Sequence, residues 1–94
     1  MKVLERRIKQ KVNKQVNFIK ENIDYITIEQ VAIIQNTINN INKIGKSIEI
    51  LFVQGIIDRQ CYALLIDYLY EMKDKLYNYK YQVSGTTLNI CKKL

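Results

Sequence analysis

The chain has 94 residues, enough for one domain with a modest core, and 48% of them are hydrophobic, which excludes a disordered chain. Proline is absent and glycine occurs three times, so the turns that a fold of many strands needs are missing. The formal net charge is +6 and histidine is absent, which argues against most catalytic and metal chemistry and favours an anionic partner.

The first predicted helix covers residues 2–24. Its apolar side chains recur every three or four residues, as in an amphipathic helix: Leu4, Ile8, Val12, Val16, Ile19 and Ile23. Seven basic residues and a single acid, Glu5, occupy the first twenty positions. The basic residues form two rows with steps of four and three, Lys2, Arg6, Lys9 and Arg7, Lys11, Lys14, so like charges stack on both sides of the apolar stripe.

These basic rows predict a contact to phosphates, which requires charge density and not particular side chains. We therefore expect nucleic acid to be bound by Arg6, Arg7, Lys9, Lys11 and Lys14. Three alternatives stay open: an acidic protein or acids of this or another subunit, a helix that is only solvated, and an amphipathic helix on an anionic membrane surface. Base-specific recognition is not expected, because a helix-turn-helix over residues 44–66 would need shorter helices.

The second predicted helix covers residues 28–54 and has clear signals at both ends. Thr27 and Gln30 match a capping box, in which each side chain bonds a backbone N–H of the other residue. Gly55 is placed to end the helix in a left-handed conformation, with Ile56 returning towards the last turn as in a Schellman motif. An apolar seam for a neighbouring helix runs along it: Val31, Ile34, Ile38, Ile41, Ile48 and Phe52.

Gly45 lies on this seam, and its role has two interpretations. The missing side chain lets a neighbouring helix approach closely, or the residue is only a weak point, because glycine is a poor helix former. Both interpretations are compatible with the sequence.

The third predicted helix covers residues 59–83, with Asp58 as its N-cap and Ser84-Gly85 as its end. Two adjacent apolar stripes give it a broad face that suits contact with both other helices or with a second subunit. We therefore expect one helical domain over residues 1–85 and a C-terminal tail over residues 86–94.

This helix also carries six of the seven tyrosines. Rings and charges alternate on the face away from the main stripe: Tyr70, Lys73, Tyr77, Lys80 and Tyr81. A protein interface is one interpretation of this face, and stacking of unpaired bases is another. The rings can also simply pack on the flanks of the bundle with their hydroxyls in water.

No catalytic or metal motif is visible, so we expect a protein that is not an enzyme and has no cofactor or metal. Asp67, Glu71 and Asp74 share a helical face and could hold Mg²⁺ or Ca²⁺ together with outside ligands. The favoured interpretation is an acidic face that is solvated and partly paired with Lys75. The two cysteines, Cys61 and Cys91, are expected to be free thiols in a reducing compartment, and the protein is expected to be cytoplasmic with no membrane span.

Together these features predict an all-α protein: three long helices in an antiparallel bundle or helical hairpin, pairing as a homodimer through the second and third helices. The predicted function is nucleic-acid binding through phosphate contacts. The abundance of Ile, Lys, Asn and Tyr is typical of AT-rich genomes, including those of phages and plasmids, so an accessory protein of such an element is expected. The alternative is an inhibitor or immunity-type module that binds a protein through the tyrosine-rich face.

Overall fold

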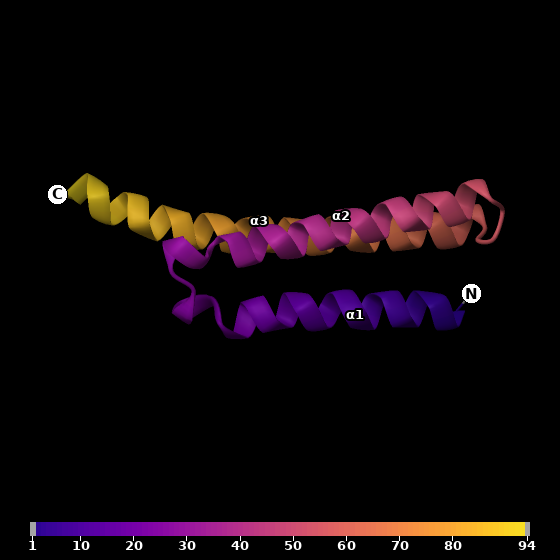
Figure 1. The fold of residues 1–94 in the computed structure, drawn as a ribbon, viewed down its shortest axis with the longest axis horizontal. Helices are drawn as coiled ribbons and strands as arrows, with labels where there is room; N and C mark the ends of the chain where they lie inside the picture. The colour runs from indigo at the N-terminus through magenta and orange to yellow at the C-terminus, as the bar shows by residue number, and fades with distance from the viewer. Residues whose placement is uncertain (1, 94) are drawn as a thin grey trace.

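The computed structural model describes the backbone of residues 2–93 and the side chains of residues 3–27 and 29–83. Within this part the chain contains three α-helices and no strand: α1 (Lys2–Glu21), α2 (Ala32–Val53) and α3 (Arg59–Lys93). The helices run up, down and up along one axis, so α2 is antiparallel to both others (Figure 1). The molecule measures 56 × 20 × 17 Å. The all-α prediction and the antiparallel bundle are confirmed.

The connection between α1 and α2 contains two 3-10 turns, η1 (Ile23–Tyr25) and η2 (Ile28–Gln30). The predicted end of the first helix at residue 24 is wrong, because α1 ends at Glu21. The side-chain amide of Asn22 donates a hydrogen bond to the carbonyl of Phe18 at 2.8 Å, and its backbone N–H donates to the carbonyls of Phe18 and Ile19, each at 3.2 Å. The last turn therefore tightens towards 3-10 geometry, and the local bond of the asparagine side chain favours a helix end without a glycine.

The predicted capping box is half confirmed. The Thr27 N–H donates to Oε1 of Gln30 at 3.3 Å, as predicted. The N–H of Gln30 donates to the backbone carbonyl of Thr27 at 2.9 Å instead of to its hydroxyl, which closes a 3-10 turn. The predicted start at residue 28 is therefore wrong, and α2 begins at Ala32.

The turn between α2 and α3 has the predicted Schellman geometry. Gly55 has a φ of 77°, and its N–H donates to the Phe52 carbonyl at 3.0 Å. The N–H of Ile56 donates to the carbonyl of Leu51 at 2.9 Å. These two bonds satisfy carbonyls of the last turn of α2 and fix a short connection between antiparallel neighbours.

The start of α3 lies where the sequence predicts it, but the end of α3 does not. Oδ1 of Asp58 accepts a hydrogen bond from the Cys61 N–H at 2.8 Å, which confirms the N-cap. The predicted end at residue 83 is wrong, because α3 continues through Ser84 and Gly85 to Lys93. Serine and glycine weaken a helix but keep the N–H that proline lacks, so they permit this continuation.

The last turns of α3 extend past the other two helices (Figure 1). Residues 86–93 are thus helical in their backbone, whereas a loose tail or one short turn was expected. The side chains of residues 84–93 lie outside the described part. The division into a domain over 1–85 and a tail over 86–94 stays a prediction.

The core forms around α3. Both α1 and α2 pack mainly on α3 and much less on each other. The broad apolar face predicted for α3 therefore serves its two neighbours. The buried side chains include Val12, Val16 and Ile19 of α1, Ile34, Ile38, Ile41 and Ile48 of α2, and Leu65, Leu69, Met72 and Leu76 of α3. Burying one such side chain contributes about 1.5–3 kcal/mol, so helix packing is the main stabilising term.

Candidate nucleic-acid interface

The predicted phosphate contacts lie on the surface of α1. Arg6, Arg7, Lys11 and Lys14 are exposed, and Lys9 is partly buried. No carboxylate among the described side chains lies within 4.0 Å of any of these five cationic groups. Their charges are therefore not neutralised internally within that part of the chain.

The one acid near the start of α1 is turned towards α3. Glu5 lies close enough to the buried Cys61 thiol to affect its ionisation: burial raises the pKa of Cys61, and a hydrogen bond with Glu5 and the charge of Glu5 raise it further. The sequence from Arg6 to Lys20 contains no acidic residue. From Arg6 to Lys20 the outer surface of α1 therefore carries basic and uncharged side chains and no acid.

The two basic rows lie on opposite flanks of α1. In the row that faces α3, Nζ of Lys9 lies 5.5 Å from the ring centroid of Tyr68. The Tyr68 hydroxyl donates to the carbonyl of Lys9 at 3.1 Å, which fixes α3 against α1 at this point. In the other row, Lys11 lines a groove between α1 and α2. The five predicted residues therefore surround α1 instead of forming one flat patch.

A hollow between α1 and α3 adds donors that the sequence did not reveal. It encloses about 270 Å³ and is lined by Asn13, Val16, Asn17, Lys20, Met72, Lys75, Asn78 and Tyr79. Lys75, which was expected to pair with Glu71, forms no ion pair with any described side chain. Lysine ammonium and asparagine amide groups are common donors to phosphate oxygens. The hollow extends the basic surface of α1 onto α3.

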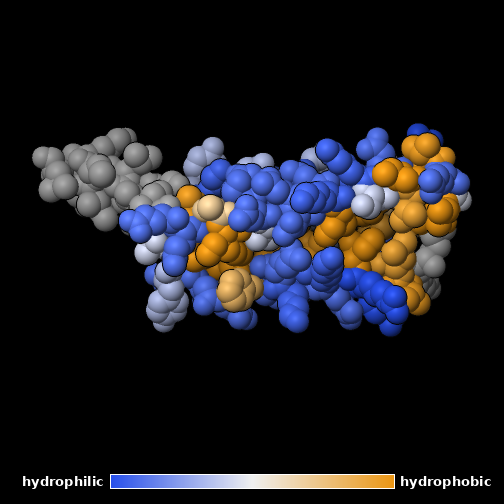
Figure 2. Space-filling view, viewed as in Figure 1, coloured by the Kyte–Doolittle hydropathy of each residue, from blue (hydrophilic) through white to orange (hydrophobic). Residues whose placement is uncertain are grey.

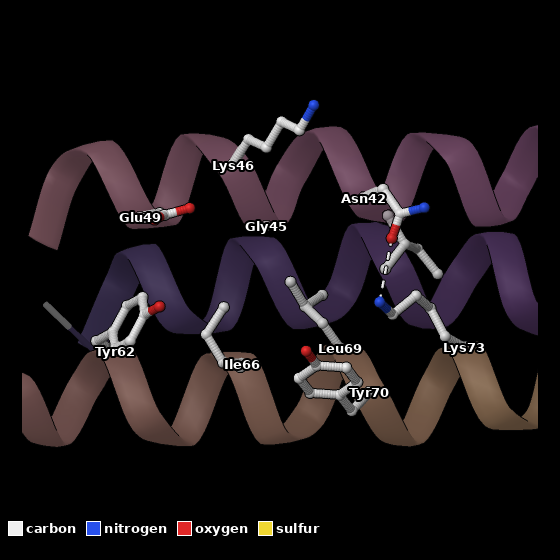
Figure 3. A pocket seen from close by; sticks show the side chains of 10 residues that line it. Asn42, Gly45, Lys46, Glu49, Tyr62, Ile66, Leu69, Tyr70 and Lys73 are labelled. Atoms are coloured by element: carbon white, nitrogen blue, oxygen red, sulfur yellow. Dashed lines mark hydrogen bonds between the residues drawn. The ribbon is translucent and has the colours of Figure 1, made fainter.

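The tyrosine-rich face contains three strongly exposed rings. Tyr70, Tyr77 and Tyr81 are 57%, 41% and 76% exposed, respectively. Tyr70 borders a groove of about 400 Å³ between α2 and α3, which we call the tyrosine groove. Figure 3 shows its walls, with α1 behind them. It is lined by Ile41, Asn42, Gly45, Lys46, Glu49, Tyr62, Ile66, Leu69, Tyr70 and Lys73.

The two lysines of this face lie at the contact between α2 and α3. Nζ of Lys73 donates to Oδ1 of Asn42 at 3.1 Å and lies 4.4 Å from the ring centroid of Tyr70 (Figure 3). Nζ of Lys80 donates to Oε1 of Gln35 at 2.7 Å. Both ammonium groups therefore join the two helices, and the exposed part of the predicted interface consists mainly of tyrosine rings.

Asp67, Glu71 and Asp74 are exposed on α3. Among the described residues, no three acidic or thiol side chains come close enough together to hold a metal ion. Cys61 is a free, buried thiol, and the side chain of Cys91 lies outside the described part.

The chain matches no protein-family model, no curated protein and no solved structure. Within the described residues, none of the helices combines the length and the apolar character that a membrane span requires.

Proposed function

We propose that this chain is a small, basic, non-enzymatic helical protein that binds nucleic acid through phosphate contacts, as a cytoplasmic accessory protein of a phage or plasmid. The outer surface of α1 makes the main contacts through Arg6, Arg7, Lys9, Lys11 and Lys14. The hollow between α1 and α3 supplies further donors.

The uncompensated charge on α1 supports this proposal most strongly. Stacked like charges disfavour a solitary helix by about 0.2–0.5 kcal/mol for each pair, and a bound polyanion relieves that repulsion. Within the described part no carboxylate pairs with these charges, and Glu5, the one acid in the first twenty residues, interacts with Cys61. Contacts of this kind fix a protein on the phosphate backbone without reading base sequence.

The test measures binding to fluorescently labelled random duplex and single-stranded DNA by anisotropy over a salt series. Binding should weaken steeply between about 50 and 200 mM salt, because each phosphate contact releases a counterion. Absence of binding at the lowest salt would refute the proposal.

Substitutions locate the contact surface. Arg6→Gln, Arg7→Gln and Lys14→Gln should each reduce the slope of log affinity against log salt by about one. Lys46→Gln, which removes the same charge from the tyrosine groove, is the matched control and should change the slope little. An equal loss from Lys46→Gln would mean that only the net charge matters, and it would contradict a site on α1.

A second candidate function is protein binding by an inhibitor or immunity-type module. The exposed ring of Tyr70 at the tyrosine groove and the exposed ring of Tyr77, two turns along α3, favour it, because tyrosine is enriched at protein interfaces. The positive charge of the chain then speeds association with an acidic partner. Tyr70→Ala with Tyr77→Ala should abolish capture of that partner and leave the circular dichroism spectrum unchanged. Tyr25→Ala removes a still more exposed ring from the connection between α1 and α2, and it should leave capture intact.

We also propose that the chain forms a homodimer through α2 and α3. The tyrosine groove supplies the contact surface, since its lining combines the apolar side chains Ile41, Ile66 and Leu69 with the exposed ring of Tyr70. Light scattering should give the mass of a dimer for the natural chain and of a monomer for the variant with Tyr70→Ala and Tyr77→Ala. A monomeric mass for the natural chain at micromolar concentration would contradict the dimer.

A further inference from the structure

An open groove separates α1 from α2 on the side away from α3. Because both helices pack on α3 and little on each other, their facing flanks are not closed by contact. The groove encloses about 310 Å³ and is lined by Leu4, Ile8, Lys11, Lys43, Ile44, Ser47, Ile48 and Leu51. Figure 2 shows hydrophobic side chains between the hydrophilic surfaces of the two helices, most extensively towards the α2–α3 turn. We call it the apolar groove.

The rows of side chains that form the apolar groove continue beyond it. On α1 the row of Leu4, Ile8 and Lys11 leads by helical steps of four and three to Gln15 and Phe18. Phe18 is exposed. From Leu4 to Phe18 the flank is about 21 Å long at ~1.5 Å per residue. A helix of about four turns matches that length.

Gln15 lies within this row and has an unsatisfied polar atom. Its Oε1 is buried and accepts no hydrogen bond within the described part of the chain. A buried acceptor without a donor is unfavourable.

The charges around the apolar groove have one sign. Lys11 and Lys43 are the only charged residues among those that line it, one from each helix. Arg7 and Lys14 continue the basic row on α1. Acidic side chains that flank an apolar stripe therefore complement this groove in both shape and charge.

A second copy of the chain does not supply such a helix among its described elements. The surfaces of α1 and α2 are basic or uncharged over most of their length. The acidic row of α3 is Asp67, Glu71 and Asp74, and the exposed large side chains three or four residues from it are Leu64, Tyr70 and Tyr77. A helix in a groove uses such side chains as anchors, but these two tyrosines carry the dimer contact proposed above, so this face is not free to enter the apolar groove. The occupant is therefore a different protein.

We propose that the apolar groove binds an acidic amphipathic helix of a protein partner, with its apolar side chains between α1 and α2 and its carboxylates at Lys11 and Lys43. This inference goes beyond phosphate binding and uses the flank of α1 that faces α2. Because Lys11 belongs to both surfaces, a bound helix competes with nucleic acid for that lysine.

The test uses a labelled peptide with leucine at heptad spacing and glutamate at the remaining positions, about 14 residues long to match the flank. An otherwise identical peptide with lysine in place of glutamate is the charge control. By anisotropy, the glutamate peptide should bind saturably and at least about tenfold more tightly than the lysine peptide. Lys11→Glu with Lys43→Glu should reverse this preference. Lys46→Glu with Lys75→Glu makes the same change of net charge elsewhere and should leave the preference unchanged.

A second pair of variants tests the apolar contact. Ile44→Gln places an amide in the groove and should weaken the glutamate peptide about tenfold. Ile50→Gln changes an exposed isoleucine of α2 outside the lining and should have little effect. Circular dichroism verifies that each variant is folded.

Three results would overturn the inference. The first is a glutamate peptide that does not bind, and the second is a preference that Lys46→Glu with Lys75→Glu reverses equally well. The third is a dimer that Ile44→Gln dissociates while Tyr70→Ala with Tyr77→Ala leaves it intact, since a second copy would then occupy the groove. Weaker DNA binding by Arg6→Gln with unchanged peptide binding would separate this surface from the phosphate contact.

Discussion

Replacing Gly45 with alanine should stabilise the protein. The residue lies within α2 and lines the tyrosine groove opposite α3. A Cβ added at this position would lie 3.7 Å from Cδ1 of Leu69, which is ordinary van der Waals contact. The structure therefore favours the weak-point interpretation of this glycine over a close helix approach that requires it.

The size of the effect follows from helix propensity and burial. Alanine is more favourable than glycine in a helix interior by about 1 kcal/mol. Burial of the added methyl group against Leu69 contributes at most about 0.8 kcal/mol more. For a domain of this size, 1 kcal/mol raises the unfolding midpoint by about 4–8 °C. Thermal and urea unfolding followed by circular dichroism at 222 nm measures both quantities.

Gly55→Ala is the matched control, because the same substitution there should have the opposite sign. Gly55 has a φ of 77°, a conformation that costs an L-residue with a side chain about 1–2 kcal/mol. No atom lies within 4 Å of an added Cβ at this glycine, so the loss would come from the backbone alone. A fall in stability for Gly45→Ala would refute the reasoning. It would mean that α3 leaves no room for a methyl group at this position, although the added Cβ lies 3.7 Å from Cδ1 of Leu69.

Three further predictions concern stability. Asp58→Ala removes the acceptor for the Cys61 N–H and should lower the free energy of unfolding by about 1 kcal/mol in urea titrations, whereas no change would contradict the cap. Leu65→Ala should cost about 2–5 kcal/mol because Leu65 is fully buried. Its neighbour Leu64, 50% exposed, is the control and should change stability by less than about 0.5 kcal/mol. Stability should also fall as pH rises above about 9, because burial raises the folded-state pKa of Cys61 from 9.0 and of Tyr68 from 10.0. The folded state then retains protons that the unfolded state has lost. Urea titrations at several pH values measure this slope, which Cys61→Ala should reduce; an unchanged slope would contradict the assignment to Cys61.

The sequence predicted the fold well wherever a single residue controls a backbone bond. Gly55 and Asp58 act locally, so the turn between α2 and α3 followed from residue type alone. The predicted ends of α1 and α3 were wrong because both a helix end and a continued helix are possible at these positions. Asn22 bonds the Phe18 carbonyl through its side chain as well as its backbone, and this local bond favours the end of α1. Serine and glycine at positions 84 and 85 are compatible both with a helix end and with the continuous helix that the structure shows.

The candidate surfaces were less predictable, because they depend on how two helices face each other. The basic rows of α1 follow from helical spacing, and their exposure agrees with that pattern for Arg6, Arg7 and Lys14. The orientation of Lys80 towards Gln35 could not be predicted, since it depends on the register between α3 and α2. The apolar groove was missed for the same reason: Leu4 and Ile8 have the spacing of core residues, but only the splay of α1 from α2 leaves them at a groove.

The central position of α3 also determines how the molecule opens. The hairpin of α2 and α3 keeps its tight Gly55 connection and its mutual contacts if α1 detaches. Detachment of α1 breaks chiefly its contacts with α3, so it should require less free energy than unfolding of the whole molecule. Amide hydrogens along Val12 to Ile19 would then exchange with solvent sooner than those around Ile41 and Leu65, and the basic surface would lie on a helix that can separate from the hairpin.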